Sequence, residues 1–203
     1  MSDCGCGSDQ VEKLEQKTLI ILSAINAVMF LAELILGWLA ESTGLIADSL
    51  DMLADAGVYG LSLYAVGKGI QHQSRAASIS GILQIILGVG VLLEVLRRFL
   101  FGSEPESILM MTVGSIALVA NLYCLMLISR HRDAGVHMRA SWIFSTNDVI
   151  ANLGVIISGG LVWLFGSRHP DLIVGAIISA VVVGGGFKIL NEAKNANKAH
   201  PGT

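Results

Sequence analysis

The stretch Ala47-Asp48-Ser49-Leu50-Asp51-Met52-Leu53-Ala54-Asp55 puts three carboxylates inside an apolar run, residues 44–66, that is long enough to cross a membrane. An ionised aspartate at the centre of a bilayer costs about 2.5 to 3.5 kcal/mol, so these side chains must face a partner or a water-filled cavity instead of lipid. Spacings of three and four residues place Asp48, Asp51 and Asp55 on one face of a helix. That face is suited to hold a divalent cation.

The alternative interpretation of this face is a polar stripe that only pairs helices, as small hydrogen-bonding residues often do in membranes. Three like charges on one stripe repel each other unless protons or a cation neutralise them. This repulsion makes Asp48, Asp51 and Asp55 the first functional candidates of the chain.

The composition indicates a membrane protein, because 53% of the 203 residues are hydrophobic and only 14% are charged. The net charge of −3 and the scattered basic residues argue against a nucleic-acid partner. Cys4 and Cys6 lie near the N-terminus and Cys124 is alone in an apolar run, so no disulfide framework is implied. The first seventeen residues mix acids with lysines, unlike a cleaved signal peptide, and the first apolar run should remain as a helix.

Six apolar runs are each long enough for a crossing, which takes ~20 residues. They cover residues 18–40, 44–66, 76–101, 107–129, 140–165 and 171–190. We therefore expect an all-α membrane protein with six transmembrane helices in one domain, 18–190. A cytoplasmic tail, 1–17, precedes this domain, and a short cytoplasmic tail, 191–203, follows it without a C-terminal soluble domain. The connection at 41–44 is very short, which predicts that the first two helices form a hairpin.

The distribution of cations predicts that both termini are cytoplasmic. The segments that are then inside carry Lys13, Lys17, Lys68, Arg75, Arg130, Arg132, Arg139, Lys188, Lys194 and Lys198, whereas those outside carry only Arg97, Arg98 and Arg168. At 1.5 Å per residue, Asp51 and Asp55 then lie about 10 to 17 Å from the outer start of the second helix, and Asp148 lies about 12 Å from the inner start of the fifth. Two helices that are distant in the sequence thus bring acids to the middle of the membrane.

These features resemble the cation diffusion facilitator family of divalent-metal transporters, over roughly residues 26–192. The stretch 47–55 is similar to the family's second-helix motif with two ligands four residues apart, at Asp51 and Asp55. The segment Ser145-Thr146-Asn147-Asp148-Val149-Ile150-Ala151-Asn152 is similar to the half-site on the fifth helix, with Asp148 as the ligand. Weaker matches to the family pattern are Asn26, Glu33, Gly37 and Glu94.

The chain departs from the family at Phe144, where the family usually has His or Asp four residues before Asp148. Asn152, one turn beyond Asp148, or Asn147 beside it would supply a carbonyl oxygen, and water would complete the shell. Three carboxylates with an amide or water form an all-oxygen site, which suits Mn²⁺, Mg²⁺ or Fe²⁺, and Zn²⁺ also accepts carboxylate ligands. The identity of the metal and of the fourth ligand stays open at this point.

The resemblance implies efflux of a divalent transition-metal cation of the zinc, manganese, iron or cobalt class across a bacterial inner membrane. Metal binding requires deprotonated ligands, which makes protons the expected counter-ion of an alternating-access antiporter. No resident cofactor is expected. Asp48 is either a ligand on the exit path or a solvated residue at its mouth, and Cys4 with Cys6 either capture soft cations or belong to an inert tail.

Other classes of function fit the sequence less well. A membrane metalloenzyme is disfavoured, because no motif such as H-E-x-x-H accompanies the acids. A passive cation channel and a non-transporting metal sensor remain as alternatives. The expected partners are divalent cations and membrane lipid. Gly81 and Gly88 share one side of the third helix, which indicates either a homodimer through transmembrane helices or packing within the bundle.

Overall fold

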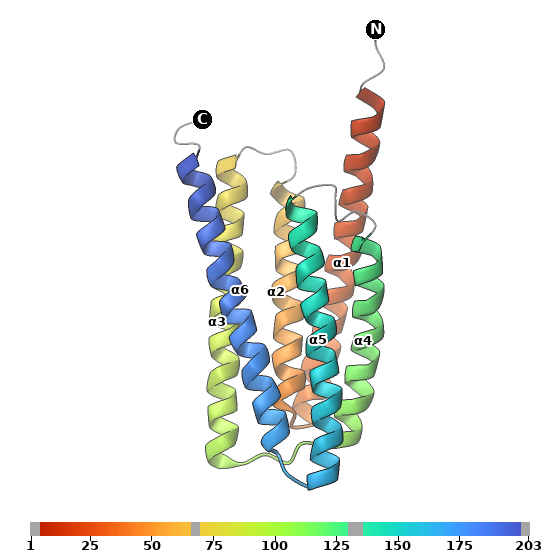
Figure 1. Cartoon of the computed structure of the whole chain (residues 1–203), viewed down its shortest axis with the longest axis vertical. Helices are drawn as coiled ribbons and strands as arrows, with labels where there is room; N and C mark the ends of the chain where they lie inside the picture. Colours follow the sequence, from red (N-terminus) through yellow and green to blue (C-terminus); the bar gives the residue numbers. More distant parts are fainter. Residues whose placement is uncertain (1–4, 66–69, 130–135, 200–203) are drawn as a thin grey trace.

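The structure is a computed structural model that describes residues 5–65, 70–129 and 136–199, and every regular element in these ranges is a helix (Figure 1). The helices are α1 (Gly5–Leu39), α2 (Thr43–Ala65), α3 (Ile70–Phe101), α4 (Ser107–Ser129), α5 (Val136–Phe165) and α6 (His169–Ala199). The all-α prediction is confirmed. Four of these helices, α1, α3, α5 and α6, run past the expected spans at the end of the bundle where both termini lie (Figure 1).

Five of the described helices are apolar and long enough to cross a membrane, with candidate spans at 16–39, 77–101, 107–129, 145–165 and 169–195. The exception among the described helices is α2, which has the length of α4 but carries three aspartates. Its position explains its composition, because α2 lies at the centre of the bundle and contacts each of the other five helices (Figure 1). A helix enclosed by other helices can carry acids without exposing them to lipid.

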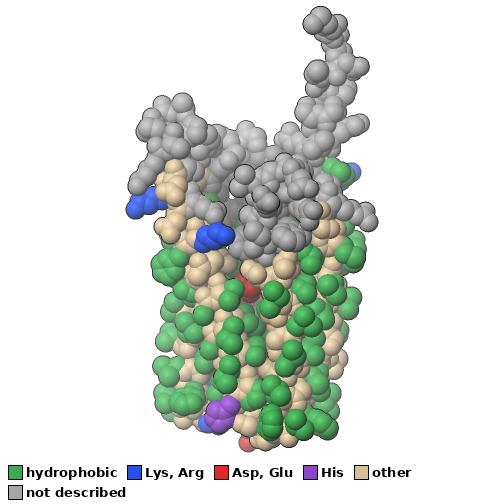
Figure 2. Space-filling model, in the orientation of Figure 1, with side chains coloured by type: hydrophobic (Ala, Val, Ile, Leu, Met, Phe, Trp, Pro, Cys, Tyr) green, Lys and Arg blue, Asp and Glu red, His purple; other side chains and the backbone are tan. Residues whose placement is uncertain are grey.

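Hydrophobic side chains are spread over the lateral surface of the face that Figure 2 shows. Many polar side chains are buried instead. Exposed examples are Val28 and Leu31 on α1, and Ile150 and Ile157 on α5. In water such a surface would be unfavourable, but lipid tails are as apolar as these side chains. The surface therefore fits a protein whose bundle is immersed in a bilayer.

The first two helices form the hairpin that the short connection predicts. The backbone N–H of Ser42 donates a 3.0 Å hydrogen bond to the carbonyl of Gly37, and Glu41 turns the chain in the left-handed region with φ of 47°. A Cβ on Gly37 would lie 2.9 Å from the Cβ of Leu45, so only glycine allows α1 and α2 to approach this closely.

Gly81 and Gly88 of α3 pack against α6 within the chain. A Cβ on Gly81 would lie 2.8 Å from the carbonyl oxygen of Gly186, and one on Gly88 would lie 2.6 Å from Val183 Cγ2. Of the two interpretations of Gly81 and Gly88, packing within the bundle is the one observed. These glycines therefore provide no argument for a homodimer, which stays a prediction.

Both termini lie at the same end of the bundle (Figure 1), as an even number of crossings requires. Which side of the membrane that end faces stays a prediction from the distribution of cations. Cys4 lies outside the described residues, and the side chains of Cys6 and Phe144 are also outside the described part of the chain.

Candidate functional site

The three aspartates of α2 are buried, with exposed fractions of 1% for Asp48, 8% for Asp51 and 2% for Asp55. They occupy successive turns of one face, as their spacing predicts. Burying an ionised carboxylate without a compensating charge is very costly, so a buried acidic face is retained only where cations or protons occupy it.

Asp148 on α5 is also buried, with 3% of its surface exposed, and its carboxyl group is a close neighbour of the Asp55 carboxyl group on α2. The charge of Asp51 also acts on Asp148. The Tyr59 hydroxyl lies one turn beyond Asp55 and contacts its Oδ2 at 3.4 Å, longer than an ordinary hydroxyl hydrogen bond. Acids from two helices that are distant in the sequence thus meet inside the bundle.

Within the described residues, no three His, Cys, Asp or Glu side chains are gathered closely enough to hold a metal ion. Asp51, Asp55 and Asp148 are thus all buried in the bundle, but their carboxyl groups do not converge on one point in this conformation. Neutral oxygen donors or a movement of the helices would be needed to complete a coordination shell from them.

Buried amide groups supply such oxygen donors. The amide nitrogen of Asn152 donates a 2.7 Å hydrogen bond to the backbone carbonyl of Asp148, which leaves its Oδ1 buried and without a partner in the described structure. Asn26 on α1 has the same arrangement, because its nitrogen donates to the Leu22 carbonyl at 2.9 Å and its Oδ1 is unpartnered. Asn147, the other candidate beside Asp148, is only half-buried.

Asn121 on α4 is a candidate ligand-binding residue that was not recognised from the sequence. Its side chain is 1% exposed, and neither its amide nitrogen nor its amide oxygen has a hydrogen-bond partner among the described residues. Its only signal in the sequence is that it is the one side-chain amide in the apolar helix α4. Buried amides normally form hydrogen bonds, so Asn121 is available to a ligand or a water molecule.

Cys124, one turn after Asn121, packs in a buried cluster with Tyr59, Leu19 and Leu22, and the charges of Asp55 and Asp148 both act on its thiol. From the sequence, Cys124 was recognised only as a lone cysteine in an apolar run. Its proximity to the acids depends on how α4 packs against α1, α2 and α5 and therefore required the structure.

Glu33 on α1 faces Asp48 on α2, and both carboxyl groups are buried. Neither oxygen of Glu33 has a hydrogen-bond partner that meets ordinary geometry in the described residues. Two adjacent acids in this setting require a proton or a cation between them. Glu33 thus extends the acidic interior from α2 toward α1.

Asp171, in the first turn of α6, holds the beginning of α2. Its carboxylate accepts hydrogen bonds from the Ser42 hydroxyl at 2.7 Å, the Gly44 backbone N–H at 3.0 Å and the Thr43 backbone N–H. The two backbone donors belong to the first turn of α2, where N–H groups have no partner within the helix, and Ser42 directly precedes that turn. Asp171 therefore positions the helix that carries the three aspartates, a role that the sequence did not reveal.

These features define a helical membrane protein with a buried acidic interior. The sequence profile of the Cation efflux transmembrane domain matches residues 19–195. The chain belongs to this family of cation efflux proteins, as its resemblance to the cation diffusion facilitators indicated, and it is a multi-pass integral protein of the bacterial inner membrane.

Its relatives carry the names of metal transporters. A zinc transporter ZitB of Yersinia pseudotuberculosis is 22% identical over 190 residues, which cover 87% of this chain and 61% of the relative. ZitB of Escherichia coli K12 is 23% identical over 192 residues, which cover 88% of this chain and 61% of the relative. A cadmium, cobalt and zinc/H⁺–K⁺ antiporter of Bacillus subtilis 168 is 23% identical over 201 residues, which cover 92% of this chain and 65% of the relative. The chain thus spans about three fifths of the length of the curated relatives that it matches.

Proposed function

We propose that the chain exports a divalent transition-metal cation from the cytoplasm in exchange for protons, by alternating access of a buried site to the two sides of the membrane. The observation that supports this most directly is the meeting of Asp55 on α2 with Asp148 on α5 inside the bundle. The transporter names of the relatives agree with it.

The proposed ligands are Asp51, Asp55 and Asp148, with the amide oxygen of Asn152 as the fourth donor. Asn152 is favoured over Asn147, because it is fully buried and its Oδ1 has no partner in the described structure. Since the three carboxylates do not converge in this conformation, a bound cation draws α2 and α5 together. Asp48, one turn nearer the α1–α2 turn, serves the exit path.

Proton coupling follows from the same carboxylates. Without a cation, several adjacent buried acids are stable only when protons neutralise some of them. Metal binding needs the deprotonated form, so the cation displaces those protons. When the empty site opens again toward the cytoplasm, it carries the protons bound to its carboxylates inward.

The choice of metal depends on the donor atoms. Oxygen donors from Asp and Asn favour Mn²⁺ or Fe²⁺, whereas the names of the relatives include zinc, cadmium and cobalt. We propose a divalent transition metal of this group as the substrate. A comparison of the five ions in one assay distinguishes them.

The direction of transport requires both termini in the cytoplasm, as the excess of cations in the segments predicted to lie inside indicates. Membrane lipid surrounds the chain, and a homodimer through the transmembrane helices is its proposed assembly. Cross-linking in the membrane tests the assembly independently of transport.

The test is metal flux into proteoliposomes under an imposed proton gradient, with Mn²⁺, Fe²⁺, Co²⁺, Zn²⁺ and Cd²⁺ compared for the wild type, Asp148→Asn and the exposed control Glu104→Gln. We expect one ion to accumulate against its gradient in the wild type and the control, and no accumulation in Asp148→Asn. Flux without dependence on protons indicates a passive channel. The absence of flux for every ion, with metal binding retained, indicates a sensor.

A further inference from the structure

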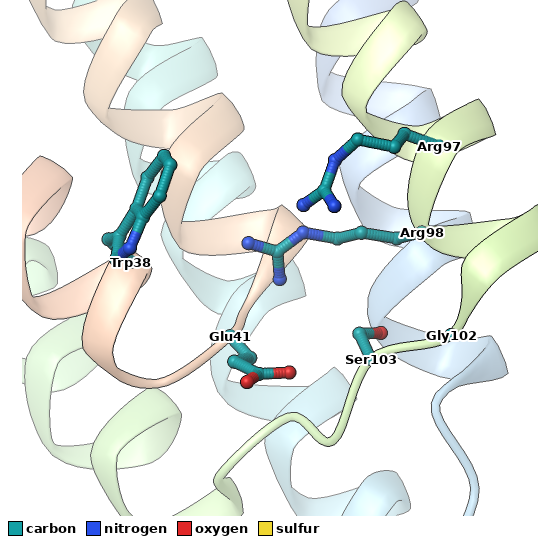
Figure 3. Close-up of a pocket in the computed structure, with 6 residues that line it drawn as sticks. All are labelled: Trp38, Glu41, Arg97, Arg98, Gly102 and Ser103. Carbon is teal, nitrogen blue, oxygen red and sulfur yellow. The ribbon is translucent and has the colours of Figure 1, made fainter.

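A pocket of about 290 Å³ lies at the end of the bundle opposite the termini (Figure 3). Its lining residues are Trp38, Glu41, Arg97, Arg98, Gly102 and Ser103. They come from the end of α1, the turn before α2, the end of α3 and the loop before α4. The pocket therefore lies between the ends of α1 and α3, and none of its lining residues belongs to the acidic interior.

Two guanidinium groups from α3 enter the pocket and share one carboxylate. Glu94 accepts hydrogen bonds from Arg97 Nε at 2.8 Å and Nη2 at 2.7 Å, and from Arg98 Nε at 2.7 Å. The forked end of Arg97 is therefore occupied. Arg98 is only 4% exposed, and its Nη1 has no hydrogen-bond partner among the described residues.

The hydroxyl of Ser103 also lines the pocket and is buried without a partner in the described structure. Buried donors of a charged group are normally paired, and phosphate oxygens are strong acceptors for guanidinium and hydroxyl groups. The Arg98 and Ser103 side chains thus offer a phosphate group two donors that the protein itself does not satisfy.

The opposite part of the pocket suits a cation. Figure 3 shows Arg97 and Arg98 reaching from α3 toward Trp38, with the carboxylate of Glu41 in the same space. Glu41 is exposed, its Oε2 accepts a hydrogen bond from the backbone N–H of Glu104 at 3.0 Å, and its charge also acts on Arg97. A carboxylate attracts an ammonium group through charge, and an indole ring that lines the same pocket attracts it through cation–π interaction.

The position of the pocket indicates where its ligand comes from. Trp38 lies next to the last residue of one candidate span, 16–39, and Arg98 lies in the last turn of another, 77–101, with Arg97 directly before it. Leu39 and Phe101 beside the pocket are exposed, at 68% and 82%. Tryptophan at the end of a span sits at the level of lipid headgroups, so the pocket lies at the boundary between headgroups and acyl chains.

We propose that this pocket binds the phosphoethanolamine headgroup of a membrane lipid. The phosphate accepts hydrogen bonds from Arg98 and Ser103, and the ammonium group lies against Glu41 and Trp38. The two arginines are balanced by Glu94 and Glu41, so a zwitterionic headgroup fits better than a purely anionic one. The volume is at the small end of ligand pockets, which suits a headgroup whose acyl chains stay outside.

Thermal unfolding of the purified, delipidated chain in detergent tests this proposal, with phosphatidylethanolamine, phosphatidylglycerol or inorganic phosphate added at equal phosphorus content. Native mass spectrometry of the retained lipid provides a second readout. We expect phosphatidylethanolamine to raise the unfolding temperature of the wild type most, phosphatidylglycerol to raise it less, and inorganic phosphate to leave it unchanged.

Three variants test the assignment of residues. Arg98→Gln should weaken the retention of phosphatidylethanolamine at least tenfold. Ser103→Leu, which fills the pocket from the loop, should do the same and provides the test if Arg98→Gln does not fold. Glu41→Gln should abolish the preference for phosphatidylethanolamine over phosphatidylglycerol while retaining both. Lys188→Gln, at an exposed position on α6, is the control and should behave as the wild type.

Equal retention of both lipids by the wild type would overturn the zwitterionic assignment. A temperature shift with inorganic phosphate equal to that with lipid would identify a site for free anions instead. Unchanged lipid retention in folded Arg98→Gln and in Ser103→Leu would remove the pocket as the binding site. None of these readouts depends on metal transport.

Discussion

The Ser42 hydroxyl donates a 2.7 Å hydrogen bond to Asp171 Oδ1, which joins the turn before α2 to the first turn of α6. The same carboxylate accepts from the backbone N–H groups of Thr43 and Gly44. One acid thus satisfies three buried donors at the start of the central helix. The acidic face of α2 begins four residues later, at Asp48.

Asp171→Ala should therefore destabilise the bundle by about 3 kcal/mol, because each buried donor left without an acceptor costs about 1 to 3 kcal/mol. Asp171→Asn keeps one acceptor oxygen and should lose less. The measurement is thermal unfolding in detergent, with Glu104→Gln as the exposed control. An unfolding temperature equal to that of the wild type in Asp171→Ala would contradict the role assigned to this residue.

Two glycines of α3 form a matched pair for the contact with α6. A Cβ at Gly88 would lie 2.6 Å from Val183 Cγ2 and 3.2 Å from the carbonyl oxygen of Ser179, whereas a Cβ at Gly90 would meet nothing within 4 Å. Both alanine substitutions gain about 1 kcal/mol of helix propensity. We expect Gly90→Ala to be neutral or stabilising and Gly88→Ala to be destabilised by about 1 to 3 kcal/mol through overpacking.

Unfolding temperatures of the two glycine variants in detergent, at a protein concentration where the chain is monomeric, provide the measurement. If Gly88→Ala unfolds like Gly90→Ala when monomeric but assembles less in the membrane, Gly88 belongs to an interface between copies and not to the α3–α6 contact.

Asn152 and Asn147 form a second matched pair, because Asn152 is the proposed fourth ligand and Asn147 is the alternative. Loss of a group that binds or orients a metal typically lowers affinity 10- to 100-fold. We expect Asn152→Ala to weaken metal binding by about tenfold or more and Asn147→Ala to weaken it by less than about threefold. Isothermal titration with the transported ion measures both, and the reverse order of the two variants would move the fourth ligand to Asn147.

Metal affinity should fall as the pH falls, because protons and the cation compete for the same carboxylates. Each proton displaced on binding changes the apparent affinity by about tenfold per pH unit in the range where it titrates. Titration in two buffers with different heats of ionisation counts the released protons. We expect a positive count that decreases in Asp148→Asn, and an affinity independent of pH would refute proton coupling at this site.

Much of the architecture could be predicted from the sequence. Apolar length identified the six helices, and the short segment at 41–44 predicted the hairpin of α1 and α2. The three aspartates of α2 share a buried face, as spacings of three and four require. These properties depend on residues close together in the sequence and on the fixed geometry of a helix, so no knowledge of neighbouring helices is needed to infer them.

The partners of those residues were decided by the tertiary structure. The same face of α2 directs Asp48 to Glu33 on α1 and Asp55 to Asp148 on α5, because the helix passes between different neighbours along its length. Asp171 gained its role only where the first turn of α6 meets the start of α2. Hydrophobic length determines that a helix forms and how deep a residue lies along it, but the side chain that a residue meets depends on contacts between segments far apart in the chain.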